Sequence, residues 1–337
     1  MDQATLIPRG ARAGALAGLA ILASACGDQG RSSGSADPGA GAAIAATQGA
    51  DGGAALGAEQ GTSQPTATPS APTCSRFETV AEFAVTWRET SGLARSARSD
   101  SILWTHNDSG GEASLAALDL AGRTLGVVGI PGARNRDWEA LSAGPCAEGS
   151  CLFIGDIGDN LNERDPVTIY RVTEPPVDAS RSARARAWSL TYPGGPRDAE
   201  GLAVHPATGE VWIVSKGRAH AIEVFRVPLG DESAEVVADP VIALTNRPVT
   251  PGRMITGATF SPDGRWLLVR SYTELFFLPV DDAGVPGPPA RPTVDLAPLG
   301  ERQGEAVEAF ADGWVYFTSE ARLSGAAPVL SRASCSF

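Results

Sequence analysis

Short apolar runs alternate with turn-forming residues from about residue 74 to the end of the chain. Turns such as Ser261-Pro262-Asp263-Gly264 and Ala311-Asp312-Gly313 separate these runs, and no long amphipathic helix interrupts them. The pattern predicts an all-β domain over residues 74–337. The expected strands are Phe83–Trp87, Ile102–Thr105, Leu115–Asp119, Cys151–Gly155, Val167–Val172, Val211–Ser215, Glu223–Val227, Trp266–Arg270, Leu275–Pro279 and Trp314–Thr318.

A short motif recurs five times within this domain. In each copy a polar residue stands before or inside a small apolar pair, and a strand-like run follows. The five polar residues, spaced by 48, 61, 56 and 49 positions, are Ser91, Glu139, Glu200, Thr256 and Glu305. Repeats of this length have room for four strands each and predict a five-bladed β-propeller. Six blades are the alternative, because the longest interval could contain a degenerate blade.

The first quarter of the chain differs from the rest. Residues 1–26 contain basic Arg9 and Arg12 and an apolar run too short to span a bilayer, which predicts an export signal. The run ends in a sequence that resembles a bacterial lipobox, with Cys26 as the lipidated residue; an ordinary cleaved signal peptide is the alternative. Residues 27–73 contain 10 Gly, 12 Ala and no aromatic residue, which predicts a disordered tether. We therefore expect an exported protein, anchored to a membrane outside the cytoplasm.

The remaining four cysteines are expected to form disulfides, because the chain is expected to be exported. Cys146 and Cys151 flank a short turn, whereas Cys74 and Cys335 lie at the two ends of the β domain. In a propeller the first and last strands usually share a blade, so the second pair would close the ring. Free thiols or metal ligands are the alternative, but the spacing matches no recognised zinc site.

The formal net charge of −12 argues against a general polyanion binder, so no nucleic-acid partner is expected. A small anion in a local basic pocket remains compatible with this charge. Lys216 is the single lysine among 27 basic residues.

The five repeated polar residues also suggest a metal site. If each one begins the innermost strand of a blade, Ser91, Glu139, Glu200, Thr256 and Glu305 converge on the axis. Such an all-oxygen set suits Ca²⁺, and a cation would relieve the repulsion among the three glutamates. The alternative is that these residues are solvated strand starts.

A second polar set follows roughly 15 residues after each repeat, where the next strand ends. Lys216 and Arg270 could hold an anion such as phosphate, and Asp108 could position or deprotonate a water molecule. We therefore take Asp108, Lys216 and Arg270 as catalytic candidates. The ligand-binding candidates are Asn107, Asp156, Tyr272 and Glu320. The alternative is that strand ends are polar because they meet solvent.

These motifs resemble the calcium-activated nucleotidases, a family of five-bladed apyrases. The similar segments are Ser91-Gly92-Leu93, His106–Gly110, Trp138-Glu139, Leu152–Gly158 and Glu305–Glu308. The resemblance implies a central Ca²⁺ held by one residue of each blade, in the order of the five repeated positions. Two departures concern the chemistry: Asn107 replaces an aspartate, and Asp159-Asn160-Leu161 replaces a Lys-Glu-Trp segment. The chain is also similar to secreted bacterial propeller lipoproteins of no established activity, which share its Asp-Trp-Glu and Gly-Asp-Ile-Gly-Asp-Asn motifs.

Three functions therefore remain open. The first is a tethered, non-catalytic propeller with an axial cation, which binds a protein, a glycan or a small phosphorylated ligand. The second is a calcium-dependent hydrolase that releases phosphate. The third is another propeller hydrolase, similar to lactonases or phytase-like esterases, on a six-bladed ring. The sequence does not decide whether the protein is an enzyme.

Overall fold

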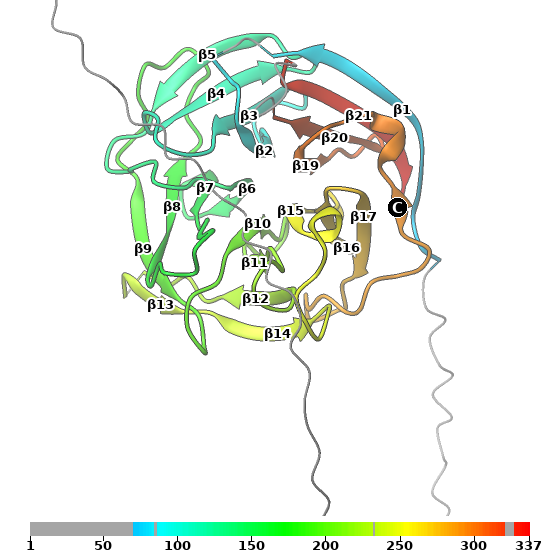
Figure 1. Cartoon of the computed structure of the whole chain (residues 1–337). Coiled ribbons are helices and arrows are strands. Elements are labelled where there is room, and N and C mark those ends of the chain that lie inside the picture. The colour runs from blue at the N-terminus through cyan, green and yellow to red at the C-terminus, as the bar shows by residue number, and fades with distance from the viewer. Residues whose placement is uncertain (1–69, 84–85, 232, 321–326) are drawn as a thin grey trace, which may run out of the picture. The chain divides into compact units, whose positions relative to one another are not determined.

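Five blades, four with four strands and one with five, surround a central axis in the computed structural model (Figure 1). The structure describes residues 70–83, 86–231, 233–320 and 327–337, which belong to one unit, Pro65–Phe337. The expected export signal, Cys26 and nearly all of the expected tether lie outside these residues. Within them, no helix is long and apolar enough to cross a membrane.

The blades follow one another along the chain, and each runs from an inner to an outer strand. Blade 1 contains β2 (Thr90–Arg95), β3 (Ile102–Asn107), β4 (Ser114–Asp119) and β5 (Thr124–Gly129). Blade 2 contains β6 (Ala140–Cys146), β7 (Gly149–Asp156), β8 (Val167–Thr173) and β9 (Arg186–Thr191). Blade 3 contains β10 (Ala199–Val204), β11 (Val211–Ser215), β12 (Glu223–Val227) and β14 (Asp239–Ala243). Blade 4 contains β15 (Ile255–Phe260), β16 (Trp266–Ser271), β17 (Glu274–Pro279) and β18 (Val294–Asp295).

Blade 5 closes the ring. It contains β19 (Gly304–Ala309), β20 (Trp314–Ser319), β21 (Val329–Ser336) and, as its outer strand, β1 (Thr73–Glu82) from the other end of the domain. The short strand β13 (Glu235–Val237) pairs in parallel with β9 and extends blade 2. The helices η1 (Pro251–Arg253) and η2 (Ala297–Leu299) are single turns of 3₁₀ type. The prediction of a five-bladed propeller closed by both chain ends is thus confirmed.

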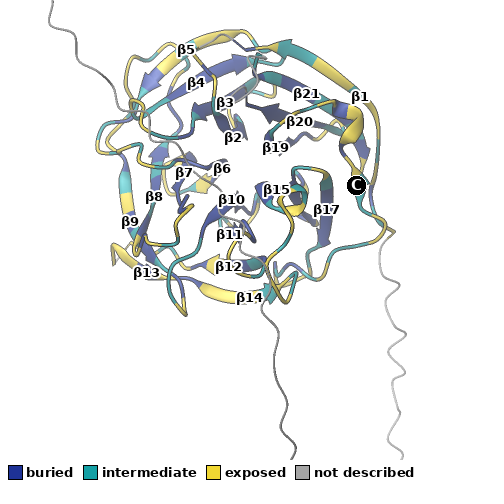
Figure 2. Ribbon diagram, viewed as in Figure 1, coloured by how far each residue is buried: buried dark blue, intermediate teal, exposed yellow. Residues whose placement is uncertain are grey.

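The apolar core lies between neighbouring blades. Figure 2 shows buried inner strands and more exposed outer ones, as in blade 3, where every residue of β10 is buried and most of β14 is exposed. Each inner strand contacts the inner strands of the two adjacent blades, so the ring of contacts is continuous. A strand that is covered on both faces needs an almost unbroken apolar sequence, which accounts for runs such as Val211–Val214.

Two sequence expectations prove wrong in the fold. The interval between residues 160 and 198 does not hold a sixth blade, because it supplies β8 and β9 of blade 2. A strand was expected at Phe83–Trp87, but the described residues of this run do not form one. Phe83 and Trp87 are instead buried beside Leu93 and Tyr316, where they fill the space between blades 1 and 5. Their apolar character therefore reflects packing and not strand pairing.

Both expected disulfides are present. Cys74 and Cys335 are directly paired residues of β1 and β21, and their bond closes a loop across a sequence separation of 261. Cys146 and Cys151 join β6 to β7 across the turn between them. The first bond fastens the ring where its two ends meet, and the second stiffens one hairpin.

Candidate functional site

The repeated polar residues coincide with irregularities in the backbone. Ser91, Glu200 and Thr256 are each skipped in the pairing of their inner strand, as the extra residue of a β-bulge, and Glu305 lies in a similar irregularity in β19. Glu139 stands directly before β6, and its N–H donates to the carbonyl of Gly155. A bulge redirects its side chain away from the normal alternation. The sequence repeat therefore marks the start of each inner strand, at one mouth of the ring.

Small residues follow these positions because the inner strands approach closely. A Cβ atom at Gly201 would lie 2.9 Å from the Cβ of Ala258 on the next blade. One at Gly257 would lie 2.9 Å from the carbonyl oxygen of Glu305. The small residue in each repeat thus permits tight packing around the axis.

A polar cavity of about 100 Å³ lies at this mouth. The second strands of the blades run antiparallel to the inner ones, so their polar ends reach the same mouth as the repeated residues. Every residue that lines the cavity carries a polar group. They are Ser91, Asp108, Glu139, Asn160, Glu200, Lys216, Arg218, Tyr272, Gln303, Glu305 and Glu320.

Most of the predicted site residues meet in this cavity. They are the catalytic candidates Asp108 and Lys216, the ligand-binding candidates Tyr272 and Glu320, and the metal candidates Ser91, Glu139, Glu200 and Glu305. Their shared location is a finding of the structure, whereas their roles remain predictions.

Lys216 places a positive charge inside the acidic cavity. Its ammonium group contacts a carboxylate oxygen of Glu200 and lies 4.0 Å from Oδ2 of Asp198. Burial by itself would lower the pKa of Lys216, but Glu200 and Asp198 raise it above its usual value. The lysine is therefore charged, and it already compensates Glu200.

Among the described residues, no ion pair of this kind is found for the other two axial glutamates, Glu139 and Glu305. Burial, and then the carboxylate of Glu200, raise the pKa of Glu139 and of Glu305 well above the usual value. A cation bound from solution beside either group would oppose this rise, because an opposite charge favours the ionised carboxylate.

Thr256 does not join the cavity lining. Its hydroxyl donates a hydrogen bond of 2.9 Å to the backbone carbonyl of Glu305. Four of the five predicted axial residues thus line the cavity, with Glu200 paired with Lys216, and their binding of Ca²⁺ remains a prediction.

A tighter group of carboxylates lies at one side of the cavity. Asp108, Asp137 and Glu139 each offer an oxygen within 4.8 Å of the others. A Cβ atom at Gly158 would lie 2.6 Å from oxygens of both Asp137 and Glu139, so glycine is needed there to let the two carboxylates approach. Three hard oxygen donors at this spacing fit Ca²⁺ or Mg²⁺ and do not fit a soft metal.

Asp137 escaped the sequence analysis although it begins the Asp-Trp-Glu motif. Burial raises its pKa, and Arg164, whose Nη1 lies 3.9 Å from Oδ2 of Asp137, opposes that shift. Asn160, Arg218 and Gln303 were also missed. They come from loops beyond the strand ends, where periodicity gives no signal.

Arg270 lies outside the described lining of the cavity. Its side chain is fully buried, and Nη1 donates to the carbonyls of Ala306 at 2.7 Å and Thr318 at 3.0 Å. Nη2 pairs with Glu301. These contacts tie blade 4 to blade 5, so the guanidinium is not positioned for the catalytic role predicted from the sequence.

Asn107 and Asp156 are likewise engaged elsewhere. The Asn107 amide donates a hydrogen bond of 2.7 Å to the carbonyl of Thr86, which holds the segment before β2 in place. Asp156 accepts from Arg164 at 2.6 Å and from the N–H of Asp137 at 3.1 Å. Asp156 thus orients the Asp137 backbone and does not line the cavity.

Comparisons with known proteins give a likeness of fold. No protein-family model matches the chain, and no curated protein sequence matches it. Among solved structures, a PQQ-bound aldose sugar dehydrogenase from Streptomyces coelicolor shares 13% identity at a TM-score of 0.49, over 80% of this chain and 100% of that one. A glucose dehydrogenase shares 13% identity at a TM-score of 0.47, over 78% of this chain and 100% of that one.

A third structure, described as a 6-phosphogluconolactonase from Bacteroides uniformis, shares 13% identity at a TM-score of 0.38, over 69% of this chain and 65% of that one. Likeness at this level concerns the fold alone and assigns neither a family nor an activity. The chemistry must therefore be argued from the residues of the cavity.

Proposed function

We propose that Asp108, Asp137 and Glu139 bind a divalent cation, foremost Ca²⁺, and that the protein is a cation-dependent ligand-binding propeller. The observation that carries this proposal is the approach of three carboxylate oxygens within 4.8 Å of one another beside a polar cavity. Ca²⁺ takes six to eight oxygen ligands, so the cavity must supply water or further groups such as the Ser91 hydroxyl.

The charge of the cavity favours this function over anion chemistry. Its lining carries five carboxylates (Asp108, Glu139, Glu200, Glu305 and Glu320) against the cations of Lys216 and Arg218, which leaves 5 − 2 = 3 excess acidic groups. An anionic substrate would be repelled unless a cation were bound first. With Lys216 on Glu200 and Arg270 outside the lining, little positive charge is left to hold a phosphate.

A calcium-dependent phosphate-releasing hydrolase, as the apyrase resemblance implies, is the second candidate. One observation favours it: Asp108 and Lys216 line the same cavity that the bound cation would adjoin. In this function a cation held by Asp108, Asp137 and Glu139 would polarise phosphate oxygens, and Lys216 would leave Glu200 to contact the substrate. A lactonase-like or phytase-like hydrolase rests on likeness of fold alone.

We also propose that the protein acts outside the cytoplasm, anchored through a lipid on Cys26. The two disulfides support an oxidising compartment, since such bonds are rare in the cytosol. The partner that the anchored propeller meets would be a protein, a glycan or a small phosphorylated molecule.

Thermal unfolding of the full-length chain in EDTA and in excess Ca²⁺ tests the cation site. A ligand at one hundred times its Kd stabilises the folded state by about 2.7 kcal/mol, which raises the Tm by several degrees. Asp137→Asn should abolish the Ca²⁺-dependent rise. Asp282→Asn, at an exposed position, is the matched control and should retain it.

Terbium luminescence gives a direct readout of the same site. Trp138 is fully buried and stands between Asp137 and Glu139 in the chain, so we expect its indole to sensitise a bound Tb³⁺ ion. Ca²⁺ should displace Tb³⁺ and so quench its luminescence, and Glu139→Gln should prevent Tb³⁺ from binding. A rise in Tm with Ca²⁺ that survives both Asp137→Asn and Glu139→Gln would place the cation elsewhere.

The same samples separate the two candidate functions. Phosphate released from ATP, ADP or pyrophosphate only with Ca²⁺, and lost in Lys216→Ala, would establish the hydrolase. Ca²⁺ binding without phosphate release would instead support the non-catalytic, ligand-binding function.

A further inference from the structure

A second cavity, of about 200 Å³, lies at the opposite end of the inner strands. It is bounded by residues at or just beyond the far ends of β2, β6, β10, β15 and β19. At about 3.3 Å per residue, Arg95 in this cavity lies roughly 13 Å along β2 from Ser91 in the acidic cavity. Between them, Leu93, Leu141 and Val307 leave a space of only about 10 Å³. The two cavities are therefore separate sites.

The lining of the second cavity combines one cation with an apolar wall. Among its described residues, Arg95 and Glu308 are the only charged ones, and Val204, Phe260 and Pro206 form the apolar side. The hydroxyls of Ser142, Thr259 and Ser261 also line it. This mixture is typical of a pocket for a small organic molecule with one polar end.

Arg95 is the group that most needs a partner. Its Nε is buried and has no hydrogen-bond partner within the described part of the chain. Its guanidinium carbon lies 6.0 Å from the centre of the Phe310 ring, which supports one face of the side chain. Glu308 has partners of its own, since it accepts from the N–H of Ala309 at 3.1 Å and from Thr259 at 3.3 Å.

We propose that this second cavity binds a small organic carboxylate, with the carboxylate group on Arg95 and the apolar body against Val204 and Phe260. The planar guanidinium matches a carboxylate in a two-point contact. A phosphate dianion fits less well, because the described lining offers no second cation and includes Glu308.

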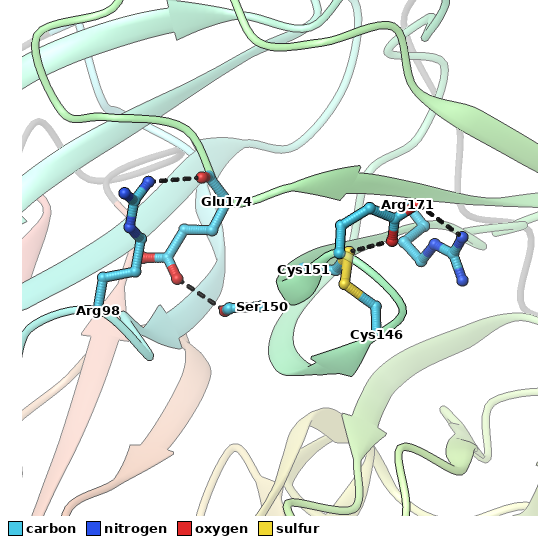
Figure 3. Close-up of a disulfide and its surroundings, with 7 residues drawn as sticks. Arg98, Cys146, Ser150, Cys151, Arg171 and Glu174 are labelled. Atoms are coloured by element: carbon cyan, nitrogen blue, oxygen red, sulfur yellow. Dashed lines mark hydrogen bonds and ion pairs between the residues drawn. A yellow bond between two sulfur atoms is a disulfide. The ribbon is translucent and has the colours of Figure 1, made fainter.

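The walls of this cavity are held in place before any ligand binds. Figure 3 shows the Cys146–Cys151 bond in the hairpin that contributes Ser150, and the hydrogen bond of 2.8 Å that Ser150 donates to Glu174. Glu174 also accepts from the N–H of Ala97, another lining residue, at 3.2 Å. A pocket with fixed walls loses little conformational entropy on binding, which favours affinity for a small ligand.

The ionisation of Glu308 supplies a signature of binding. Burial, partly opposed by Arg95, raises the pKa of Glu308 to about 7. A bound carboxylate nearby would raise this pKa further, so the complex should take up protons near neutral pH. Arg95 from β2 and Thr259 from β15 are the polar groups that face Glu308 from neighbouring elements.

Calorimetric titration of the full-length chain with benzoate tests the proposal. Benzoate should bind, take up protons in buffers of differing ionisation enthalpy, and bind at least about tenfold more tightly than neutral benzamide. Arg95→Gln should lower the affinity for benzoate at least tenfold, that is, by about 1.4 kcal/mol. Arg247→Gln, at an exposed arginine outside the lining, is the matched control and should bind benzoate like the unaltered protein.

A second variant guards against a folding defect in Arg95→Gln. Ala97 is exposed and lines the cavity, so Ala97→Leu should narrow the cavity. This variant should bind benzoate more weakly than the unaltered protein and have the same Tm. No benzoate binding at millimolar concentration would overturn the proposal. Equal binding by the unaltered chain, Arg95→Gln and Ala97→Leu would also overturn it. Neither result bears on the cation site at the other mouth.

Discussion

Replacing Glu308 by glutamine should change how the stability of the protein depends on pH. The carboxyl is buried and its pKa is raised from the usual 4.5 to about 7, so the folded state holds this proton over a range where the unfolded state has lost it. Its contribution to stability is complete below pH 4.5 and is lost as the pH rises towards 7. Each pH unit across this window lowers the free energy of unfolding by about 1.4 kcal/mol, so the total loss is about 3 kcal/mol.

The Glu308→Gln side chain cannot titrate, yet it can keep both hydrogen bonds. Its amide oxygen can accept from the N–H of Ala309, and its NH₂ can donate to Thr259, whose hydroxyl can rotate. The variant should therefore gain stability over the unaltered protein as the pH rises, and the gain should level off above about pH 7.

Urea unfolding between pH 4.5 and 8 measures this difference directly. Removing the exposed Glu112 by Glu112→Gln is the matched control and should leave the pH profile of stability nearly unchanged, because solvent screens its charge. A constant difference between the Glu308→Gln variant and the unaltered protein across this range would refute the reasoning.

Two further predictions concern how the ring is held together. Replacing both Cys74 and Cys335 by serine opens a loop across a sequence separation of 261, and urea unfolding should show a loss of about 5–6 kcal/mol by loop entropy. An unchanged midpoint would mean that strand pairing alone holds the ring. Gly201→Ala would bring a methyl group to 2.9 Å from the Cβ of Ala258 and should cost about 1–3 kcal/mol. Gly111→Ala, which meets no atom within 4 Å, should be neutral in the same assay, and equal losses in the two variants would exclude packing at the axis as the cause.

The sequence by itself predicted where each blade begins and favoured five blades, whereas the structure was needed to exclude a sixth. Five repeats of a polar residue next to small residues specify five inner strands, because glycine or alanine is required where those strands converge. The cysteine positions likewise predicted both disulfides, since Cys146 and Cys151 flank one short turn and Cys74 and Cys335 lie at the two ends that a closed propeller brings together.

The tertiary structure decided which polar side chains share a site. Arg270 and Lys216 both lie near the ends of second strands, but Arg270 pairs opposite Gly257 within β16, whereas Lys216 follows the last residue of β11. The first is held by the carbonyls of Ala306 and Thr318, and the second reaches Glu200. Asp137 and Glu139 both precede β6 in an irregular segment beside Gly158, where strand periodicity does not set the direction of their side chains. Periodicity predicts which strand a residue belongs to, whereas the direction of a side chain in a bulge or loop depends on the backbone that surrounds it.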